Sequence, residues 1–287
     1  MALEAAGTVE LGGDLTVCRL GYGAMRLTGE GIWGPPKDHD EAIAVLRSTI
    51  ELGVDFIDTA DSYGPSVNEE LIAEALWPYP ENLVIATKAG WTRGGPGMWG
   101  HNATPAHLRQ ALEGSLKRLR VDRIDLYQLH IPDPMISIED SLKTLVEMQS
   151  QGKIRHIGLS NVTKEHIERA RKVCPIVSVQ NRYSFADREW DYVVDHCEKN
   201  DIVFIPWFPL AAGQAGMDAV QKVAKAHKAT PMQIALAWLL QRSPKILTIP
   251  GTSSVKHLNE NLGAPELRLS KDEYKELASV QELTFSR

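Results

Sequence analysis

The chain has 287 residues, of which 43% are hydrophobic and 24% charged, and this composition excludes disordered, coiled-coil and collagen-like proteins. The formal net charge of −6, without any run of Lys and Arg, argues against a nucleic-acid partner. The three cysteines, Cys18, Cys174 and Cys197, are too far apart in sequence for a zinc site or a disulfide framework, so we expect no bound metal.

The first residues of the chain do not have the pattern of a targeting segment. They lack a basic stretch followed by an apolar stretch, and no run of about 18 apolar residues occurs in the chain. We therefore expect a soluble, cytoplasmic protein without a membrane partner. Residues 7–17 alternate between apolar and polar types on both sides of Gly12 and Gly13, which predicts a small β-hairpin.

Eight short runs with the composition of β-strands follow, at residues 19–23, 56–59, 83–88, 124–130, 154–160, 176–180, 202–207 and 246–251. The stretches between them, such as DEAIAVLRSTIELG and PMQIALAWLLQRSP, repeat apolar residues every three or four positions, which predicts helices with one core-facing side. Eight alternations favour the α/β class and a (β/α)₈, or TIM, barrel, and the lack of a G-x-G-x-x-G turn argues against a doubly wound sheet. We expect one domain over residues 1–287, with the hairpin capping the barrel floor.

Four polar residues lie where the second, third and fourth runs end. Asp58 closes the second run, Tyr63 follows five residues later, Lys88 ends the third run and His130 ends the fourth. Taken one at a time, a helix cap, a loop tyrosine or a solvated strand end explains each of them equally well. Because the active sites of such barrels lie at the C-terminal ends of the strands, the four together point to catalysis.

The combination of these four side chains has a chemical reason. A phenol with a pKa of about 10 is a poor proton donor at neutral pH, and a nearby ammonium group, here Lys88, would lower that pKa. Asp58 would keep the partly desolvated ammonium charged. A neutral His130 would orient a substrate carbonyl and stabilise the developing oxyanion. The sequence therefore predicts that Tyr63 is a general acid.

With these residues in place, the sequence resembles the aldo-keto reductases over about residues 20–261. The motifs that carry the resemblance are LGYGAM, DTADSYG, the lysine that ends the third run, YQLH, IGLSN, VQNRYS, PWFPLAAG and IPGTSSVKHLNENL, in that order. The resemblance implies a catalytic tetrad of Asp58, Tyr63, Lys88 and His130, with Tyr63 as the proton donor. It also implies reduction of an aldehyde or ketone by a nicotinamide cofactor that is bound without a Rossmann fold.

The resemblance also implies cofactor contacts. Ser160, Asn161 and Gln180 match the groups that hold the nicotinamide carboxamide, and Trp207 stands where the family usually has a tyrosine stacked on the nicotinamide ring. The other matched positions are Gly23, Ala24 and Met25 near the ribose, Phe208, Pro209, Leu210 and Gly213 along the pyrophosphate, Gly251, Thr252, Ser253, Ser254, His257, Glu260 and Asn261 at the adenosine end, and Asp58 of the tetrad.

Two departures from the family pattern bear on the choice of cofactor. Gly251 and His257 replace the Lys and Arg that many members direct at the 2′-phosphate of NADP. The run of hydroxyls from Thr252 to Ser254 still opens a predicted helix, and the backbone amides at a helix N-terminus attract phosphate. We therefore expect NADPH, with NADH as the alternative.

The chain resembles in particular bacterial members described as pyridoxal reductases, at motifs such as IGLSNVT and TPMQIALAWLLQRSP. Tyr63 and His130 are expected to contact the substrate. Trp91 and Trp99, in the long segment 90–104, would add an aromatic wall for a flat aldehyde such as pyridoxal, although core packing explains each Trp equally well.

Other roles remain open at this level. Arg93 and His101 are further candidates for contact with a substrate anion or ring hydroxyl. An intact tetrad also fits a cofactor-binding regulatory or redox-sensing subunit with slow turnover. A barrel isomerase or aldolase would instead use Lys88 to form a Schiff base with its substrate.

Overall fold

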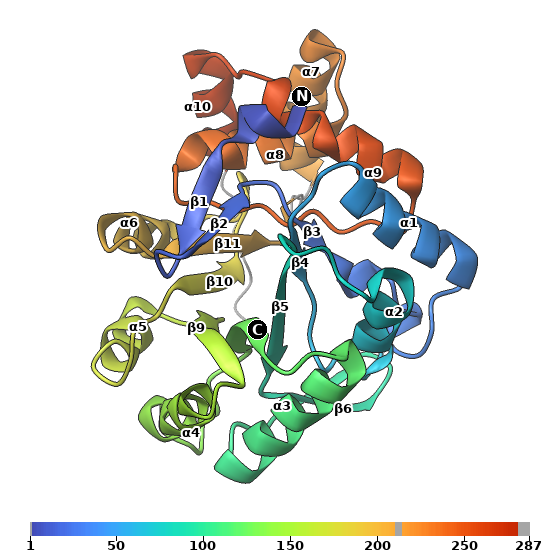
Figure 1. Cartoon of the computed structure of the whole chain (residues 1–287). Helices are drawn as coiled ribbons and strands as arrows, with labels where there is room; N and C mark the ends of the chain where they lie inside the picture. The colour runs from blue at the N-terminus through green and yellow to red at the C-terminus, as the bar shows by residue number, and fades with distance from the viewer. Residues whose placement is uncertain (1, 210–213, 281–287) are drawn as a thin grey trace.

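The structure is a computed structural model that describes residues 2–209 and 214–280, and its centre is a curled parallel β-sheet surrounded by helices (Figure 1). Seven parallel strands pair side by side, each with the next one along the chain that belongs to this sheet. In that order they are β3 (Tyr22–Gly23), β4 (Phe56–Asp58), β5 (Val84–Ala89), β8 (Ile124–Leu129), β9 (Ile154–Ser160), β10 (Ser178–Arg182) and β11 (Val203–Trp207).

The sheet closes on itself through residues 246–248, which lie between its two edge strands. Ile246 forms a parallel bridge with Phe204 of β11, and Thr248 forms one with Leu20, just before β3. The backbone of Thr248 makes hydrogen bonds of 2.9 and 2.8 Å to the segment that leads into β3. The eighth predicted run therefore completes the barrel, although as isolated bridges and not as a regular strand. The predicted (β/α)₈ class is confirmed.

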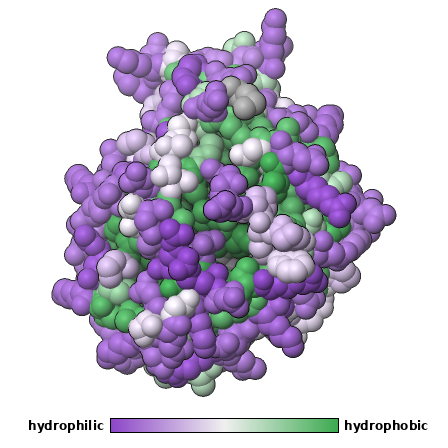
Figure 2. All heavy atoms as spheres, viewed as in Figure 1, coloured by the Kyte–Doolittle hydropathy of each residue, from purple (hydrophilic) through white to green (hydrophobic). Residues whose placement is uncertain are grey.

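The outer layer consists of helices whose starts follow from local sequence. Thr104 caps a helix whose first residue is Pro105, and Thr230 forms a capping box with Gln233, so that otherwise free backbone amides find acceptors. The helices are α1 (His39–Glu51), α2 (Val67–Leu76), α3 (Pro105–Leu119), α4 (Ile138–Ser150), α5 (Lys164–Ala170), α6 (Asp191–Lys199), α7 (Gln214–His227), α8 (Pro231–Arg242), α9 (Val255–Leu262) and α10 (Lys271–Ser279). Figure 2 shows hydrophilic residues over these helices and hydrophobic residues toward the middle of the molecule.

The predicted N-terminal hairpin is present and closes one end of the barrel. Strands β1 (Thr8–Leu11) and β2 (Leu15–Cys18) pair antiparallel, and Gly12 and Gly13 in the turn have positive φ angles of 66° and 80°, which glycine adopts without strain. The apolar side chains of the hairpin pack with those from the first residues of the barrel strands, such as Phe56 of β4. The hairpin therefore covers the N-terminal ends of the strands and leaves the C-terminal rim open.

The long segment after β5 has more structure than the sequence indicated. It forms a second antiparallel hairpin from β6 (Trp91–Gly95) and β7 (Met98–His101), with an irregular register between Arg93 and Gly95. This hairpin begins directly after Lys88 and Ala89. It therefore lies on the same rim of the barrel as the predicted catalytic residues.

Candidate active site

Three neighbouring strands bring the predicted tetrad together at the C-terminal rim. Asp58 is the last residue of β4, Lys88 lies next to the end of β5, and His130 directly follows β8. The Lys88 Nζ atom lies 2.7 Å from Asp58 Oδ2 and 5.3 Å from the centroid of the Tyr63 ring. The rings of Tyr63 and His130 meet edge to face with their centroids 5.9 Å apart. The four side chains therefore form one cluster.

The Lys88 ammonium is fully buried and has two oxygen acceptors. It donates to Asp58 and, at 2.8 Å, to the carbonyl oxygen of Thr59. The other carboxylate oxygen of Asp58 accepts from Gln180 at 2.8 Å and from Gln128 at 3.5 Å. Burial lowers the pKa of Lys88, and the Asp58 charge opposes that shift. The carboxylate thus performs the stabilising task expected from the sequence.

His130 is held as a neutral imidazole. Burial, with a further contribution from the Lys88 charge, holds the pKa of His130 well below its usual value of 6.5. Its Nδ1 atom lies 3.5 Å from the Ser62 hydroxyl, and its backbone carbonyl accepts from the Asn161 side chain at 3.0 Å. A neutral ring can donate one hydrogen bond to a substrate oxygen, which agrees with the role expected for this residue.

The expected direction of the Tyr63 pKa is wrong for this site. Burial raises the pKa of Tyr63 well above 10, and the charges of Asp58 and Asp61 raise it further. Loss of hydration, which destabilises the charged phenolate, is the largest cause of this rise. The phenol therefore keeps its proton at neutral pH until a stronger base accepts it.

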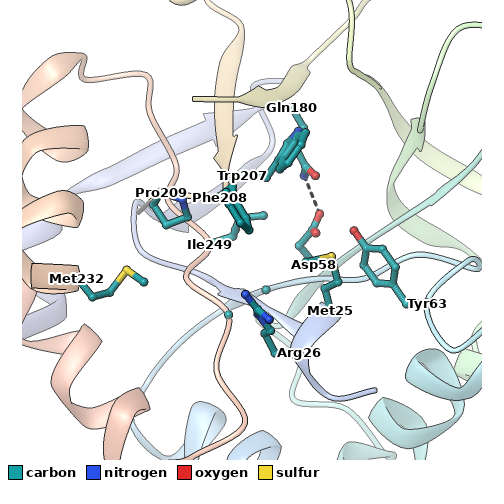
Figure 3. A pocket seen from close by; sticks show the side chains of 12 residues that line it. Met25, Arg26, Asp58, Tyr63, Gln180, Trp207, Phe208, Pro209, Met232 and Ile249 are labelled. Atoms are coloured by element: carbon teal, nitrogen blue, oxygen red, sulfur yellow. Dashed lines mark hydrogen bonds between the residues drawn. The ribbon is translucent and has the colours of Figure 1, made fainter. Parts of the chain in front are cut away.

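A cavity of about 270 Å³ opens beside the tetrad (Figure 3). Nine of the predicted site residues line it, namely Gly23, Met25, Asp58, Tyr63, Gln180, Trp207, Phe208, Pro209 and Gly251. The cavity thus unites residues from the first, second, sixth, seventh and eighth runs of the sequence. Figure 3 shows the hydroxyl of Tyr63 beside Asp58, and the hydrogen bond from Gln180 to the Asp58 carboxylate.

Three residues of the cavity wall were not predicted: Arg26, Met232 and Ile249. Arg26 follows the GYGAM motif directly, so the presence of a cation next to a ligand-binding turn was the signal available in the sequence. The aliphatic part of the Arg26 side chain lies next to Gly251: a Cβ atom added to Gly251 would be 3.4 Å from Arg26 Cγ. Arg26 thus supplies a positive charge close to Gly251, one of the positions where a family cation is missing.

Ser160 and Asn161 lie behind the cavity, at the end of β9. The Ser160 hydroxyl donates to the Gln180 carbonyl at 2.8 Å, and Asn161 has a positive φ angle of 56° and donates to Ser160 and to the His130 carbonyl. Ala24 is fully buried, and its carbonyl accepts from Asn68 at 2.8 Å. These residues hold the rim together, and none of the three is among the described residues that line the cavity.

The predicted adenosine end lies at the start of α9. Among the described residues the Ser254 side chain accepts no capping hydrogen bond, and Thr252 Oγ1 accepts from the Ser254 amide at 3.1 Å instead. Glu41 of α1 accepts from the Val255 amide at 3.0 Å. A carboxylate from another helix thus accepts from one of the amides that we expected to attract a phosphate.

The other predicted adenosine contacts have varied exposure. Ser253 and His257 are exposed, Glu260 is half-buried and Asn261 is buried. Of the predicted pyrophosphate contacts, Phe208 is partly exposed with a positive φ angle of 64°, whereas Leu210 and Gly213 lie outside the described residues.

The second hairpin places aromatic rings beside the tetrad. Trp91 meets the ring of His130 edge to face at 6.4 Å and that of Trp99 at 5.6 Å, while His101 lies against Trp91 at 4.6 Å. Trp91 is half-buried and lies beside the tetrad instead of in the barrel core, and neither Trp91 nor Trp99 is among the described residues that line the cavity. Arg93 does not point at a substrate position, because all its N–H groups donate to backbone carbonyls. The suggestion that Arg93 binds a substrate anion is wrong.

Two other features bear on the kind of site. Among residues 2–209 and 214–280, no group of three or more His, Cys, Asp or Glu side chains is arranged to hold a metal ion. Within the same ranges, no helix has both the length and the apolar character needed to cross a membrane.

Comparisons with known proteins identify one family. The model described as "Aldo/keto reductase family" matches residues 19–282. Pyridoxine 4-dehydrogenase of Escherichia coli (strain K12) is 47% identical over 267 residues, which cover 91% of this chain and 93% of that protein. A thermostable aldo-keto reductase, Tm1743, solved in complex with the inhibitor epalrestat, is 34% identical with a TM-score of 0.84, covering 95% of this chain and 99% of that one. An aldo-keto reductase from Klebsiella pneumoniae in complex with NADPH is 26% identical with a TM-score of 0.79, covering 94% and 93% of the two chains.

Proposed function

The chain belongs to the aldo/keto reductase family, and on that premise we propose that Tyr63 is the general acid of an active site completed by Lys88, Asp58 and His130. The protein is an NAD(P)H-dependent oxidoreductase that acts on aldehydes and ketones. The observation that carries the residue roles is the buried cluster in which Lys88 lies 2.7 Å from Asp58 and 5.3 Å from the centre of the Tyr63 ring.

The cavity has the chemistry that a nicotinamide cofactor needs. Trp207 offers an aromatic face, Gln180 offers an amide, and Arg26 offers a cation for a phosphate group. When bound, the cofactor supplies the hydride. Phe208 and Pro209, which also line the cavity, would contact the cofactor, and Ser160 and Asn161 would hold Gln180 and His130 in position through their hydrogen bonds.

The proton step follows from the charges around Tyr63. A phenol with a raised pKa does not protonate a ground-state carbonyl, but it can protonate the much more basic alkoxide oxygen that develops as hydride arrives. The phenolate that remains would be stabilised by the Lys88 ammonium. His130, neutral because of its burial, would donate a hydrogen bond to the same substrate oxygen and fix its position.

For the substrate, we propose a flat aromatic aldehyde such as pyridoxal. Support comes from the aromatic wall of Trp91 and Trp99 beside His130, and from the 47% identity with an enzyme named pyridoxine 4-dehydrogenase. Rings of this kind bind flat conjugated molecules by stacking and edge-to-face contact. Trp99 contributes only part of its surface, because the Arg93 guanidinium covers one face at 3.7 Å.

A Schiff-base role for Lys88 has weaker support. Its amine is buried and already donates to Asp58 and Thr59, so a substrate carbonyl has no open approach to it. No described feature favours a slow regulatory subunit. We further propose that residues 1–287 act as one barrel unit in the cytoplasm, a location that stays a prediction from the sequence.

Replacement of Tyr63 by Phe tests the proposed acid. We expect the turnover number for pyridoxal with NADPH to fall by about 10²–10⁴-fold, because the variant lacks the donated proton. The dissociation constant for NADPH, measured by fluorescence titration, should stay within about twofold of the wild-type value, since only one oxygen is removed.

Tyr127→Phe is the matched control. Tyr127 is also fully buried, but its hydroxyl makes no hydrogen bond with any residue that the structure describes. Its loss should leave turnover unchanged. Wild-type turnover in the Tyr63 variant, or an equal loss in both variants, would contradict the proposed role of Tyr63.

A further inference from the structure

The side chain of Arg93 is fully engaged with the backbone of three loops. A guanidinium group has five N–H bonds, and each of the five here donates to a different carbonyl oxygen. The acceptors are Gly31 and Ile32 at 2.7 Å each, Ser62 at 2.9 Å, Met98 at 3.3 Å and Gly95 at 3.4 Å. No donor is left for a ligand, so the side chain must act through what it holds.

The three segments that Arg93 joins all belong to the rim of the site. The first follows β3, the second contains Ser62, whose neighbour is the proposed acid Tyr63, and the third is the turn of the aromatic hairpin β6–β7. Backbone hydrogen bonds also link the first segment to the other two: Gly34 to Gly64 at 2.7 Å, and Gly97 to Gly31 at 3.1 Å.

The same guanidinium contacts aromatic rings of the rim. Its central carbon lies 3.7 Å from the centroid of the Trp99 ring and 5.7 Å from that of Trp33. Trp99 in turn meets Trp91, which lies against His130. The planar guanidinium stacked on Trp99 thus fixes the orientation of the aromatic wall formed by Trp99 and Trp91. Its hydrogen bond to the Ser62 carbonyl fixes the loop that carries Tyr63.

We propose that Arg93 is a positioning residue that joins the loop of the proton donor to the aromatic wall of the substrate site. One side chain then determines both where the Tyr63 hydroxyl lies and how the ring of a flat substrate packs. The proposal rests on the proposed function of Tyr63. It goes beyond that function because it makes Arg93 responsible for the position of the Tyr63 hydroxyl and for the preference for flat substrates. Arg93 itself would touch neither the substrate nor the cofactor.

The proposal predicts different effects on two kinds of substrate. In Arg93→Gln, a displaced Tyr63 should lower kcat at least tenfold for both pyridoxal and propanal, because a small shift of a catalytic group has a large effect on the rate. A loosened aromatic wall should raise KM at least fivefold for pyridoxal alone. The dissociation constant for NADPH should stay within about twofold, since none of the five contacts involves the cofactor cavity.

A second readout does not depend on activity. Hydrogen exchange at the amides of Gly34, Gly64 and Gly97 should become at least tenfold faster in Arg93→Gln, because these amides close the contacts between the joined segments. Arg93→Lys keeps the charge but has only three donors and no planar face, so it should show a smaller change of the same kind. If Arg93→Gln does not fold, Arg93→Lys takes its place in both the kinetic and the hydrogen-exchange measurements.

Arg109→Gln is the matched control, because Arg109 of α3 makes an exposed ion pair with Glu147 of α4 and, among the described residues, no hydrogen bond or ion pair with the rim. It should match the wild type in all readouts. Kinetic constants within twofold of wild type in folded Arg93→Gln would overturn the proposal, as would a parallel loss of NADPH affinity. Failure of the proposed function is distinct from this, because it would appear as wild-type turnover in Tyr63→Phe.

Discussion

The Lys88 ammonium is buried inside the barrel, where a charged group without a partner would lose its hydration and be unstable. Asp58 and the Thr59 carbonyl are its two acceptors, and Gln180 and Gln128 occupy the second oxygen of the carboxylate. Removal of one partner from a buried ion pair leaves an uncompensated charge and typically costs about 3–5 kcal/mol. Lys88 and Asp58 are therefore under structural constraint as well as being proposed catalytic groups.

His130 should make the stability of the protein depend on pH. Burial and the Lys88 charge hold its pKa well below 6.5 in the folded state, whereas the unfolded chain regains a value near 6.5. As pH falls below about 6.5, the unfolded state binds a proton that the folded state does not, so the free energy of unfolding decreases. The slope for one such proton is at most about 1.4 kcal/mol per pH unit.

Urea unfolding of the wild type and of His130→Asn at several values between about pH 5.5 and 7.5 measures this contribution. The variant should lose less stability than the wild type as the pH falls. The other histidines whose pKa is lowered by burial are present in both proteins, so the difference between the two curves isolates residue 130. Parallel curves would contradict the assignment of a depressed pKa to His130.

At the scale of the elements, an amide at the N-terminus of helix α9 finds its hydrogen-bond acceptor in a different helix. The Val255 amide at its N-terminus donates to Glu41 of α1, so a carboxylate occupies a position that would attract a phosphate. The exposed residues His257 and Ser253 lie close by in sequence. This arrangement bears directly on the expected preference for NADPH, because a negative charge opposes the binding of a 2′-phosphate.

Glu41→Gln should therefore increase the preference for NADPH over NADH. The amide oxygen can still accept from Val255, but the negative charge is gone, and removal of about 1 kcal/mol of repulsion corresponds to an increase of about fivefold in the ratio of kcat/KM values. Steady-state kinetics with both cofactors measures this ratio. Asp40→Asn removes a neighbouring exposed carboxylate of the same helix and should leave the ratio unchanged. An unchanged ratio in Glu41→Gln would show that this carboxylate does not act on the cofactor.

At the scale of the whole molecule, the barrel has one closed end and one open end. The hairpin β1–β2 packs with the inward side chains at the N-terminal ends of the strands, while the tetrad and the cavity lie at the C-terminal ends. The hydrophobic contacts of the hairpin thus lie at the opposite end of the barrel from the buried charges of the site. A substitution at the closed end should change stability without changing the chemistry.

Leu11→Ala tests this separation. Leu11 of β1 is fully buried among the apolar side chains of the hairpin and the barrel strands, and removal of such a side chain leaves a cavity that lowers the free energy of unfolding by about 2–5 kcal/mol. Chemical denaturation should show this loss, while kcat and KM at 25 °C stay near the wild-type values. Leu52→Ala, at a partly exposed position, should cost far less. A loss of activity in the folded Leu11 variant would contradict the independence of the two ends.

The alternation of strands and helices, the N-terminal hairpin and the place of Asp58, Lys88 and His130 at strand ends could all be predicted from the sequence. Apolar residues at every second position, or at every third and fourth, predict strands and helices because side chains point to alternating or single faces. In parallel strands that follow one another, the C-terminal ends meet at one rim. Residues at those ends are therefore neighbours in space although they lie tens of residues apart.

Other properties depended on packing that no local pattern encodes. The pKa of Tyr63 is raised, and not lowered as expected, because burial, which is a property of the folded surroundings, destabilises the phenolate. Arg93 looked like a free cation in sequence, yet carbonyl groups from three loops engage all its donors. Glu41 reached the start of α9 from a helix more than 200 residues earlier. Sequence alone determined which chemical groups this protein has and which rim they share, whereas the tertiary structure decided their solvation and partners, because both arise only when distant segments come into contact.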